Sequence, residues 1–124
     1  MIKDIQAFHE KFGLSQSGEP RMLDLEQSMF RVTCLKEEVA EFEEAMQRGD
    51  LVESFDALID LVYFALGTAH LMNLPFEEGW KRVHEANMAK VRAELASDSK
   101  RGSAYDVVKP AGWKAPTLDD LVNR

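Results

Sequence analysis

Apolar residues recur every three or four positions along most of the chain, which is the spacing of one packed helix face. Between about residues 25 and 48 this face carries Leu35, Val39, Phe42 and Met46. The same spacing predicts helices over residues 2–11, about 51–72 and about 76–95, and a last helical turn at TLDDL capped by Thr117. No alternating strand pattern is visible in the sequence.

Short connections separate the predicted helices, and they contain the turn and cap residues Gly49, Asp50, Asn73 and Pro75. Helices joined in this way pack as antiparallel neighbours. We therefore predict an all-α fold, an antiparallel helical bundle of four main helices, with an irregular tail over about residues 97–124. A length of 124 residues favours one domain covering residues 1–124.

The composition narrows the class of protein. A formal net charge of -7 disfavours general binding to nucleic acid or to an anionic membrane, because both need basic surfaces. The N-terminal segment carries charges throughout, and no apolar run approaches the length of a membrane-spanning helix. We expect a cytoplasmic protein with no nucleic-acid or membrane partner. Cys34 is the only cysteine, which excludes an internal disulfide and a cysteine cluster for zinc.

An acidic stripe follows the second predicted helix in the segment LKEEVAEFEEAM. Glu37, Glu38 and Glu41 lie on one side of this helix, and Glu38 borders the apolar face. Like charges three and four residues apart repel each other. A solvated helix face is the plain interpretation of such a stripe, and it stays open at this point.

The third helix carries the more demanding signal, DALIDLVYFALG, in which Asp60 is surrounded by apolar residues. Glu53 and Asp56 share its stripe, so two consecutive helices each present three carboxylates on one face. Partly buried charges cost several kcal/mol unless they are paired or bind a metal. Mg²⁺ is a hard cation that takes carboxylate oxygens, waters and phosphates. The alternative is a salt bridge from Asp60 to a basic residue such as Arg31.

The fourth helix contains HEANMAK, in which Asn87 falls on the apolar side and Lys90 at its edge. An asparagine in such a position must find hydrogen-bond partners. A lysine beside an acidic metal site suits a phosphate chain, and a satisfied core position is the alternative for Asn87.

These segments resemble the all-α nucleoside triphosphate pyrophosphatases, a superfamily that includes MazG-like proteins, dimeric dUTPases and phosphoribosyl-ATP pyrophosphohydrolases. Its signature is Glu-Glu-x-x-Glu on one helix and Glu-x-x-Asp on the next, and Glu37, Glu38 and Glu41 match the first half. The resemblance looks closest to small MazG-like members and extends through five segments in order: FHEKFG, KEEVAEF, DALIDLVYFALGTA, HEANMAK and KPAGWKAP.

The second half of the signature fits in two registers. Glu53 and Asp56 satisfy Glu-x-x-Asp literally. Alignment on the following Leu-Val-Tyr and on the later glycine instead places the family aspartate at Asp60 and Ala57 where its glutamate should be. We favour the second register, with Asp56 offering the replacement carboxylate, and which of Glu53 and Asp56 touches metal stays open.

The resemblance implies a Mg²⁺-dependent nucleoside triphosphate pyrophosphohydrolase, with Mn²⁺ as a substitute ion. A metal-bound water would attack the α-phosphorus and convert a (d)NTP into the monophosphate and pyrophosphate. The implied metal ligands are Glu38, Glu41, Asp56 and Asp60, with Glu37 beside them. Glu37 or Glu38 would orient or deprotonate the water. The implied substrate contacts are Arg31, Asn87 and Lys90 on phosphates or sugar, and Trp113 on the base, with core packing as the alternative for Trp113.

The resemblance also implies a homodimer or homotetramer, because members of the superfamily assemble by pairing bundles. A house-cleaning role against aberrant nucleotides and a dUTPase-like role both fit this chemistry. The alternatives are a phosphoribosyl-ATP pyrophosphohydrolase and, from another class, a non-catalytic helical interaction module whose acidic stripes bind a basic partner.

Overall fold

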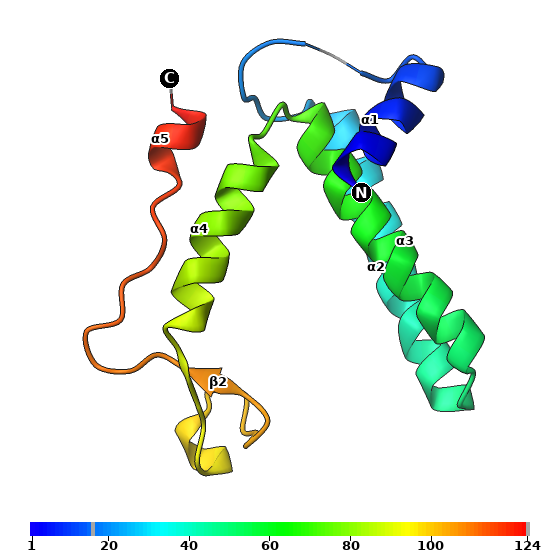
Figure 1. The fold of residues 1–124 in the computed structure, drawn as a ribbon. Coiled ribbons are helices and arrows are strands. Elements are labelled where there is room, and N and C mark those ends of the chain that lie inside the picture. Colours follow the sequence, from blue (N-terminus) through cyan, green and yellow to red (C-terminus); the bar gives the residue numbers. More distant parts are fainter. Residues whose placement is uncertain (16, 124) are drawn as a thin grey trace. The chain divides into compact units, whose positions relative to one another are not determined.

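The computed structural model describes residues 1–15 and 17–123, and it confirms the all-α prediction. Positions 16 and 124, the latter in the predicted tail, lie outside the described residues. The described helices are α1 (Ile2–Lys11), α2 (Leu25–Arg48), α3 (Leu51–Leu71), α4 (Phe76–Met88) and α5 (Asp119–Val122) (Figure 1). A 3-10 turn (Ala96–Asp98) and two short strands, β1 (Val91–Arg92) and β2 (Val107–Val108), follow α4.

The chain divides into two compact units, Met1–Phe76 and Glu77–Arg124. The first contains α1, α2 and α3, and the second contains α4 and the segments that follow it. A single domain over residues 1–124 stays a prediction, and each unit is described here by itself.

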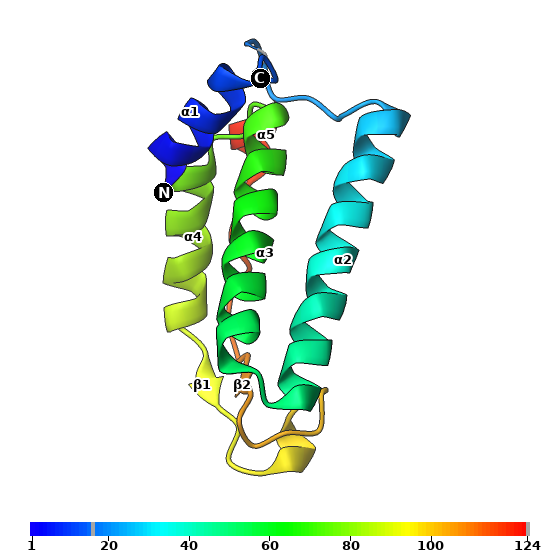
Figure 2. The same ribbon diagram turned by 90° about the vertical axis from the view of Figure 1, so that its right-hand side faces the viewer.

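The first unit is built on an α2–α3 hairpin, whose helices run antiparallel (Figure 2). Gly49 ends α2 in the left-handed region at φ 69°, where a glycine has no side-chain penalty. Asp50 then caps α3 by accepting a 3.0 Å bond from the Glu53 amide, as predicted. Asp24 caps α2 in the same way through a 2.7 Å bond from the Gln27 amide. Gly49 and Asp50 therefore fix the two ends of the hairpin turn, and Asp24 fixes the start of α2.

Small residues fill the α2–α3 contact. Ala45 and Ala57 are buried, and Ser54 is buried with its hydroxyl donating to the Asp50 carbonyl at 2.7 Å. Short side chains let the two helix backbones approach closely. Helix α1 packs on α3 and buries Ile5 and His9. The acidic stripes of α2 and α3 are thus carried by a rigid, closely packed pair of helices.

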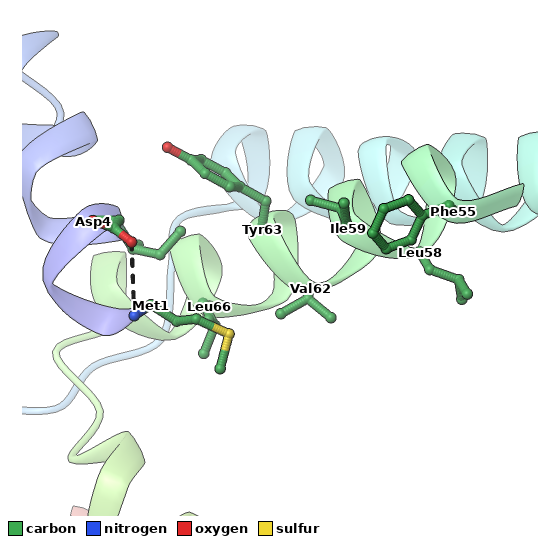
Figure 3. Close-up of a pocket in the computed structure, with 9 residues that line it drawn as sticks. Met1, Asp4, Phe55, Leu58, Ile59, Val62, Tyr63 and Leu66 are labelled. Atoms are coloured by element: carbon green, nitrogen blue, oxygen red, sulfur yellow. Dashed lines mark ion pairs between the residues drawn. The ribbon is translucent and has the colours of Figure 1, made fainter. Parts of the chain in front are cut away.

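One face of α3 keeps large apolar side chains in solvent. They line a groove of about 470 Å³ between α1 and α3, formed mainly by Phe55, Leu58, Ile59, Val62 and Leu66 (Figure 3). Phe55 is 65% exposed and Val62 is 48% exposed. Exposed apolar surface of this extent marks an interaction site more often than a free surface. Within the described residues no helix combines the length and the apolar character that crossing a membrane requires.

The second unit corrects two sequence predictions. Helix α4 ends at Met88 and not near residue 95, because the next residues pair with the tail. Strands β1 and β2 are antiparallel, with Val91 opposite Val108 and Arg92 opposite Val107. The Ala93 amide continues this pairing by donating to the Asp106 carbonyl at 2.9 Å. The prediction of an irregular tail without strands was therefore wrong at this ladder.

The last helical turn is confirmed as α5, but its predicted cap is wrong. The residue before α5 is Leu118, which makes no side-chain cap bond. The Thr117 carbonyl instead accepts a 2.9 Å bond from Arg82 on α4. Arg82 also pairs with Asp120 at 2.7 Å and with Glu78 at 3.2 Å, and this ion-pair network holds α5 to α4.

Candidate functional site

Four predicted metal ligands lie within electrostatic reach of one another on the α2–α3 hairpin. The pKa of Glu38 is raised to about 7, mainly by burial and in addition by the neighbouring carboxylates Glu41, Asp60 and Asp56. Burial also raises the pKa of Asp60, again with help from Asp56 and Glu41. Desolvation and like charge both disfavour the ionised carboxylate. The two helices therefore bring Glu38, Glu41, Asp56 and Asp60 together as one cluster.

The donor set of this cluster fits a hard divalent cation. The Glu38 Oε2 atom is buried and has no hydrogen-bond partner. Glu41 lies within hydrogen-bond reach of Glu38, but two carboxylates can share a bond only with a proton between them. A cation would satisfy the buried oxygen and offset the mutual repulsion. Among the described residues, no three His, Cys, Asp or Glu side chains already converge as a metal cage, so the ligand set stays a prediction.

The structure bears on the choice between the two registers of the second motif. The charge of Asp56 raises the pKa of both Glu38 and Asp60, whereas Glu53 raises neither pKa. Ala57, which occupies the position of the family glutamate, is buried in the α2–α3 contact. Asp56 as the replacement carboxylate stays a prediction.

Arg31 is buried on α2 and has no salt bridge among the described residues. Its Nε donates to the Thr68 hydroxyl at 3.0 Å, and its guanidinium lies 5.5 Å from the centre of the Phe64 ring. Burial lowers the pKa of Arg31, and no carboxylate acts on that pKa. The proposed salt bridge from Asp60 to Arg31 is therefore absent from this part of the structure.

Arg31 and Asp60 both line a pocket of about 270 Å³, together with aromatic residues and a histidine: Phe8, His9, Tyr63 and Phe64. His9 is fully buried, and its Nδ1 donates to the Ile5 carbonyl at 2.8 Å. Its Nε2 has no partner. The pocket thus offers hydrogen-bonding atoms and ring faces next to the carboxylate cluster.

Gly67 makes room for this pocket. A side-chain carbon at position 67 would touch the Arg31 guanidinium and would lie 2.9 Å from the His9 Cε1 atom. Only glycine therefore allows both groups to rest against α3 at this point.

The other predicted substrate contacts lie in the second unit. Asn87 is exposed near the end of α4, and Lys90 lies two residues beyond the end of the helix. The indole N–H of Trp113 donates to the Ala86 carbonyl at 2.7 Å. The ammonium groups of Lys90 and Lys109 lie 5.2 Å and 5.0 Å from the centre of the Trp113 ring. The contacts predicted for Asn87, Lys90 and Trp113 with substrate stay predictions.

Sequence reasoning missed His9 as part of the pocket, and it missed Gly67 and Thr68 as the residues against which Arg31 rests. A glycine inside an apolar helix costs up to about 1 kcal/mol relative to alanine, so Gly67 was a usable signal. His9 gave no comparable signal, because its burial depends on how α1 docks on α3. Glu37 was assigned to the cluster and is exposed.

Comparison with known families gives one match, over residues 5–87, to the family described as phosphoribosyl-ATP pyrophosphohydrolase. The matched region runs from α1 to the end of α4 and includes the cluster, the pocket and Gly67. No curated protein matches the chain. Members of the family are pyrophosphohydrolases of nucleotide-like substrates, which supports a hydrolase acting on acid anhydrides. Because the match covers more than half of its length, the chain belongs to the phosphoribosyl-ATP pyrophosphohydrolase family, in the MazG-like all-α nucleotide pyrophosphohydrolase superfamily.

Proposed function

We propose that the protein is a Mg²⁺-dependent nucleoside triphosphate pyrophosphohydrolase, which converts a (d)NTP and water into the (d)NMP and pyrophosphate. The observation that carries the proposal is the carboxylate cluster, in which the pKa values of Glu38 and Asp60 are raised and one Glu38 oxygen is buried without a partner. Perturbed acids of this kind concentrate at functional sites. A purely structural helix face would not leave the Glu38 oxygen buried without a partner.

The ion would be held by Glu38, Glu41, Asp56 and Asp60, with Mn²⁺ as a substitute. When bound, Mg²⁺ supplies positive charge to the phosphates and makes a coordinated water more acidic. All four residues offer only oxygen donors, which is the ligand chemistry that Mg²⁺ selects.

Glu38 is our choice for the general base. A carboxylate beside a metal-bound water can accept the proton of that water, and Glu38 lies within the carboxylate cluster. The water oxygen would form a bond to the α-phosphorus as the bond from that phosphorus to the bridging oxygen breaks. The water proton goes to Glu38, and the electron pair of the broken bond leaves with pyrophosphate. Glu37, which is exposed beside Glu38, would orient the water.

The pocket next to the cluster would receive the part of the nucleotide that follows the α-phosphate. Asp60 belongs to both the cluster and the pocket lining, so a substrate held at the carboxylates lies beside Arg31 and His9. The guanidinium of Arg31 would donate to sugar or phosphate oxygens, and aromatic rings offer packing surface to a sugar or base. Asn87 and Lys90 would contact the phosphates, where Lys90 stabilises developing negative charge.

The family match favours a second candidate substrate. The family takes its description from phosphoribosyl-ATP, in which the same kind of phosphoanhydride is broken. The cluster would perform the same displacement on either substrate, so the two candidates differ only in what the pocket accepts.

Product analysis tests the proposal. Purified protein is incubated with Mg²⁺ and a panel of canonical and modified nucleoside triphosphates and phosphoribosyl-ATP, with EDTA as control. We expect monophosphate and pyrophosphate from at least one triphosphate, and no product in EDTA. Turnover of phosphoribosyl-ATP alone would select the second candidate. Turnover that persists in EDTA would refute the metal-dependent mechanism.

We also propose that the protein is a homodimer or homotetramer that uses the exposed apolar face of α3. Support comes from the groove between α1 and α3, which leaves Phe55 and Val62 in solvent. Light scattering at micromolar concentration should give a mass of two or four chains. A monomer mass would count against this assembly.

A further inference from the structure

Two lysines face each other at one end of the β1–β2 ladder. Val91 pairs with Val108, and the next pair outward in the same register is Lys90 with Lys109. Residues directly opposite on an antiparallel ladder place their side chains on the same face, a few ångströms apart. Like charges in that position destabilise the pairing. The fold therefore holds two positive charges together against their repulsion.

Trp113 holds both lysines. The two ammonium nitrogens lie 5.2 Å and 5.0 Å from the centre of its ring, within the range of a cation–π contact. The ring is itself fixed, because its N–H donates to the Ala86 carbonyl on α4 at 2.7 Å. One side chain thus sets the positions of two cations that come from opposite strands.

Neither lysine has an acidic partner in the part of the chain that the structure describes. This is unexpected in a chain of net charge -7, in which 22 acidic residues outnumber 15 basic ones. The nearby Arg101 does pair with a carboxylate, Asp106, at 3.0 Å. Arg92 adds a third cation to the lysine face of the ladder, where it lies 5.9 Å from the centre of the Tyr105 ring.

We propose that Lys90 and Lys109 together bind the phosphate chain of the nucleotide, and that Trp113 is the positioning residue for both. All three residues lie beyond the matched residues 5–87. The family resemblance implies a phosphate contact for Lys90, whereas the pairing of Lys90 with Lys109 and the positioning role of Trp113 rest on the structure. Assignment of the ligand to a nucleotide rests on the proposed function. The recognition chemistry itself, two fixed ammonium groups without a counter-ion, requires only a polyphosphate.

A chain of phosphates fits this pair better than a single phosphate. Each lysine ammonium is a point charge with three donors, and the two approach the ring from opposite strands. An anion whose charge extends over two or more phosphates can contact both groups at once. Bound in this way it would also cancel the repulsion between them.

Calorimetric titration of the full-length protein with tripolyphosphate, at low salt and without Mg²⁺, tests the site. Lys109→Met keeps the aliphatic stem on the ring and removes the charge, and we expect it to weaken binding about three- to tenfold. Lys109→Arg should retain binding. Lys114→Met is the matched control, because Lys114 is exposed in the same segment and its ammonium has no contact with the Trp113 ring. Orthophosphate at the same concentration should bind much more weakly.

A double-mutant cycle tests whether the lysines act on one anion. If they do, Lys109→Met should have a smaller effect when Lys90 is already methionine. Trp113→Phe keeps a ring but loses the N–H bond to Ala86. In steady-state assays this variant should raise KM and also lower kcat, because Lys90 stabilises charge that develops on the phosphates, whereas a loss of folded protein would leave KM unchanged.

The outcomes separate this inference from the proposed function. Equal tripolyphosphate affinity in the Lys109→Met and Lys114→Met proteins, or equal binding of orthophosphate, would overturn the lysine-pair site even if nucleotides are hydrolysed. In another outcome, the wild-type protein binds tripolyphosphate and Lys109→Met loses that binding, while no nucleotide is hydrolysed. That result would support the lysine-pair site and refute the proposed enzyme activity. Circular dichroism checks folding, and Lys90→Met repeats the test from the opposite strand if Lys109→Met does not fold.

Discussion

Acidic side chains have opposite surroundings in the two compact units. In the second unit, hydrogen bonds from Arg82 lower the pKa of Asp120, and a hydrogen bond from Ser99 is the main cause that lowers the pKa of Asp106. In the first unit, burial and neighbouring carboxylates raise the pKa of Glu38 and Asp60. Asp106 and Asp120 in the second unit are thus stabilised by hydrogen-bond donors, whereas Glu38 and Asp60 in the first unit lie among carboxylates that repel them.

This difference separates structural charges from candidate functional ones. Paired groups such as Arg82 and Asp120 connect elements of the fold and need nothing further. Among the described residues, charged side chains without an oppositely charged partner are found in both units. They are acidic in the first unit, as the carboxylate cluster, and basic in the second, as Lys90 and Lys109. A chain with an excess of acids could have paired those lysines. Charges left unpaired at a cost in stability are the better markers of ligand contacts.

Among the proposed substitutions, we expect Asp60→Asn to have the largest effect. Loss of this metal ligand should lower kcat by at least about a hundredfold, equivalent to about 3 kcal/mol of transition-state stabilisation. The melting temperature of the metal-free protein should not fall, because the neutral amide relieves repulsion from Asp56 and Glu41. Steady-state kinetics and calorimetric melting measure both effects. Survival of full activity would show that the site is misassigned.

Gly67→Ala comes next in expected size. In an open helix this change would stabilise by up to about 1 kcal/mol. At Gly67 the new methyl meets the Arg31 guanidinium and His9, so we expect a loss of about 1–3 kcal/mol in unfolding free energy and a raised KM. Gly79→Ala is the matched control, since nothing lies within 4 Å of its added carbon. Denaturant melts should show opposite signs for the two variants, and equal signs would contradict the packing of the pocket.

A third prediction concerns pH and Glu38. Because folding raises its pKa from 4.5 to about 7, the folded state binds this proton more tightly than the unfolded state. The contribution to stability is complete below pH 4.5 and is lost as the pH rises to about 7. In EDTA, Glu38→Gln should remove this dependence, so the stability curves of the two proteins should diverge across that interval. Parallel curves would mean that Glu38 is not held in the cluster.

The smallest effect is expected for Asp120→Asn. The lowered pKa of Asp120 means that its bond to Arg82 stabilises the fold above the ordinary aspartate pKa and is lost as the pH falls through the lowered value. The pair is exposed, so the melting temperature should fall only slightly at pH 7. Nucleotide hydrolysis should be unchanged. A large loss of activity would place the Arg82–Asp120 pair in the site and remove the contrast between the units.

The sequence was sufficient for the first unit because its signals are local. Apolar spacing, Gly49 and the cap Asp50 predict α2 and α3 almost to the residue. The end of α4 was not predictable in this way. No glycine or proline lies between Met88 and Gly102, and the helix stops because Val91 pairs with Val108, a contact between distant residues.

The same distinction between local signals and contacts of distant residues applies to the candidate site. Helical periodicity is enough to place Glu38 and Asp60 on facing stripes, since both stripes follow from the positions within each helix. It could not show that Arg31 bonds to Thr68 in preference to Asp60, because that choice depends on packing between α2 and α3. Nor could it bring Lys109 to Lys90, which requires the strand register.

The central claim is that the acidic cluster binds a divalent cation, and Mg²⁺ titration by isothermal calorimetry tests it most directly. The wild-type protein should bind Mg²⁺ saturably, and Asp60→Asn should lose most of that binding while Asp120→Asn retains it. Equal Mg²⁺ binding in all three proteins, or none in the wild type, would contradict the account.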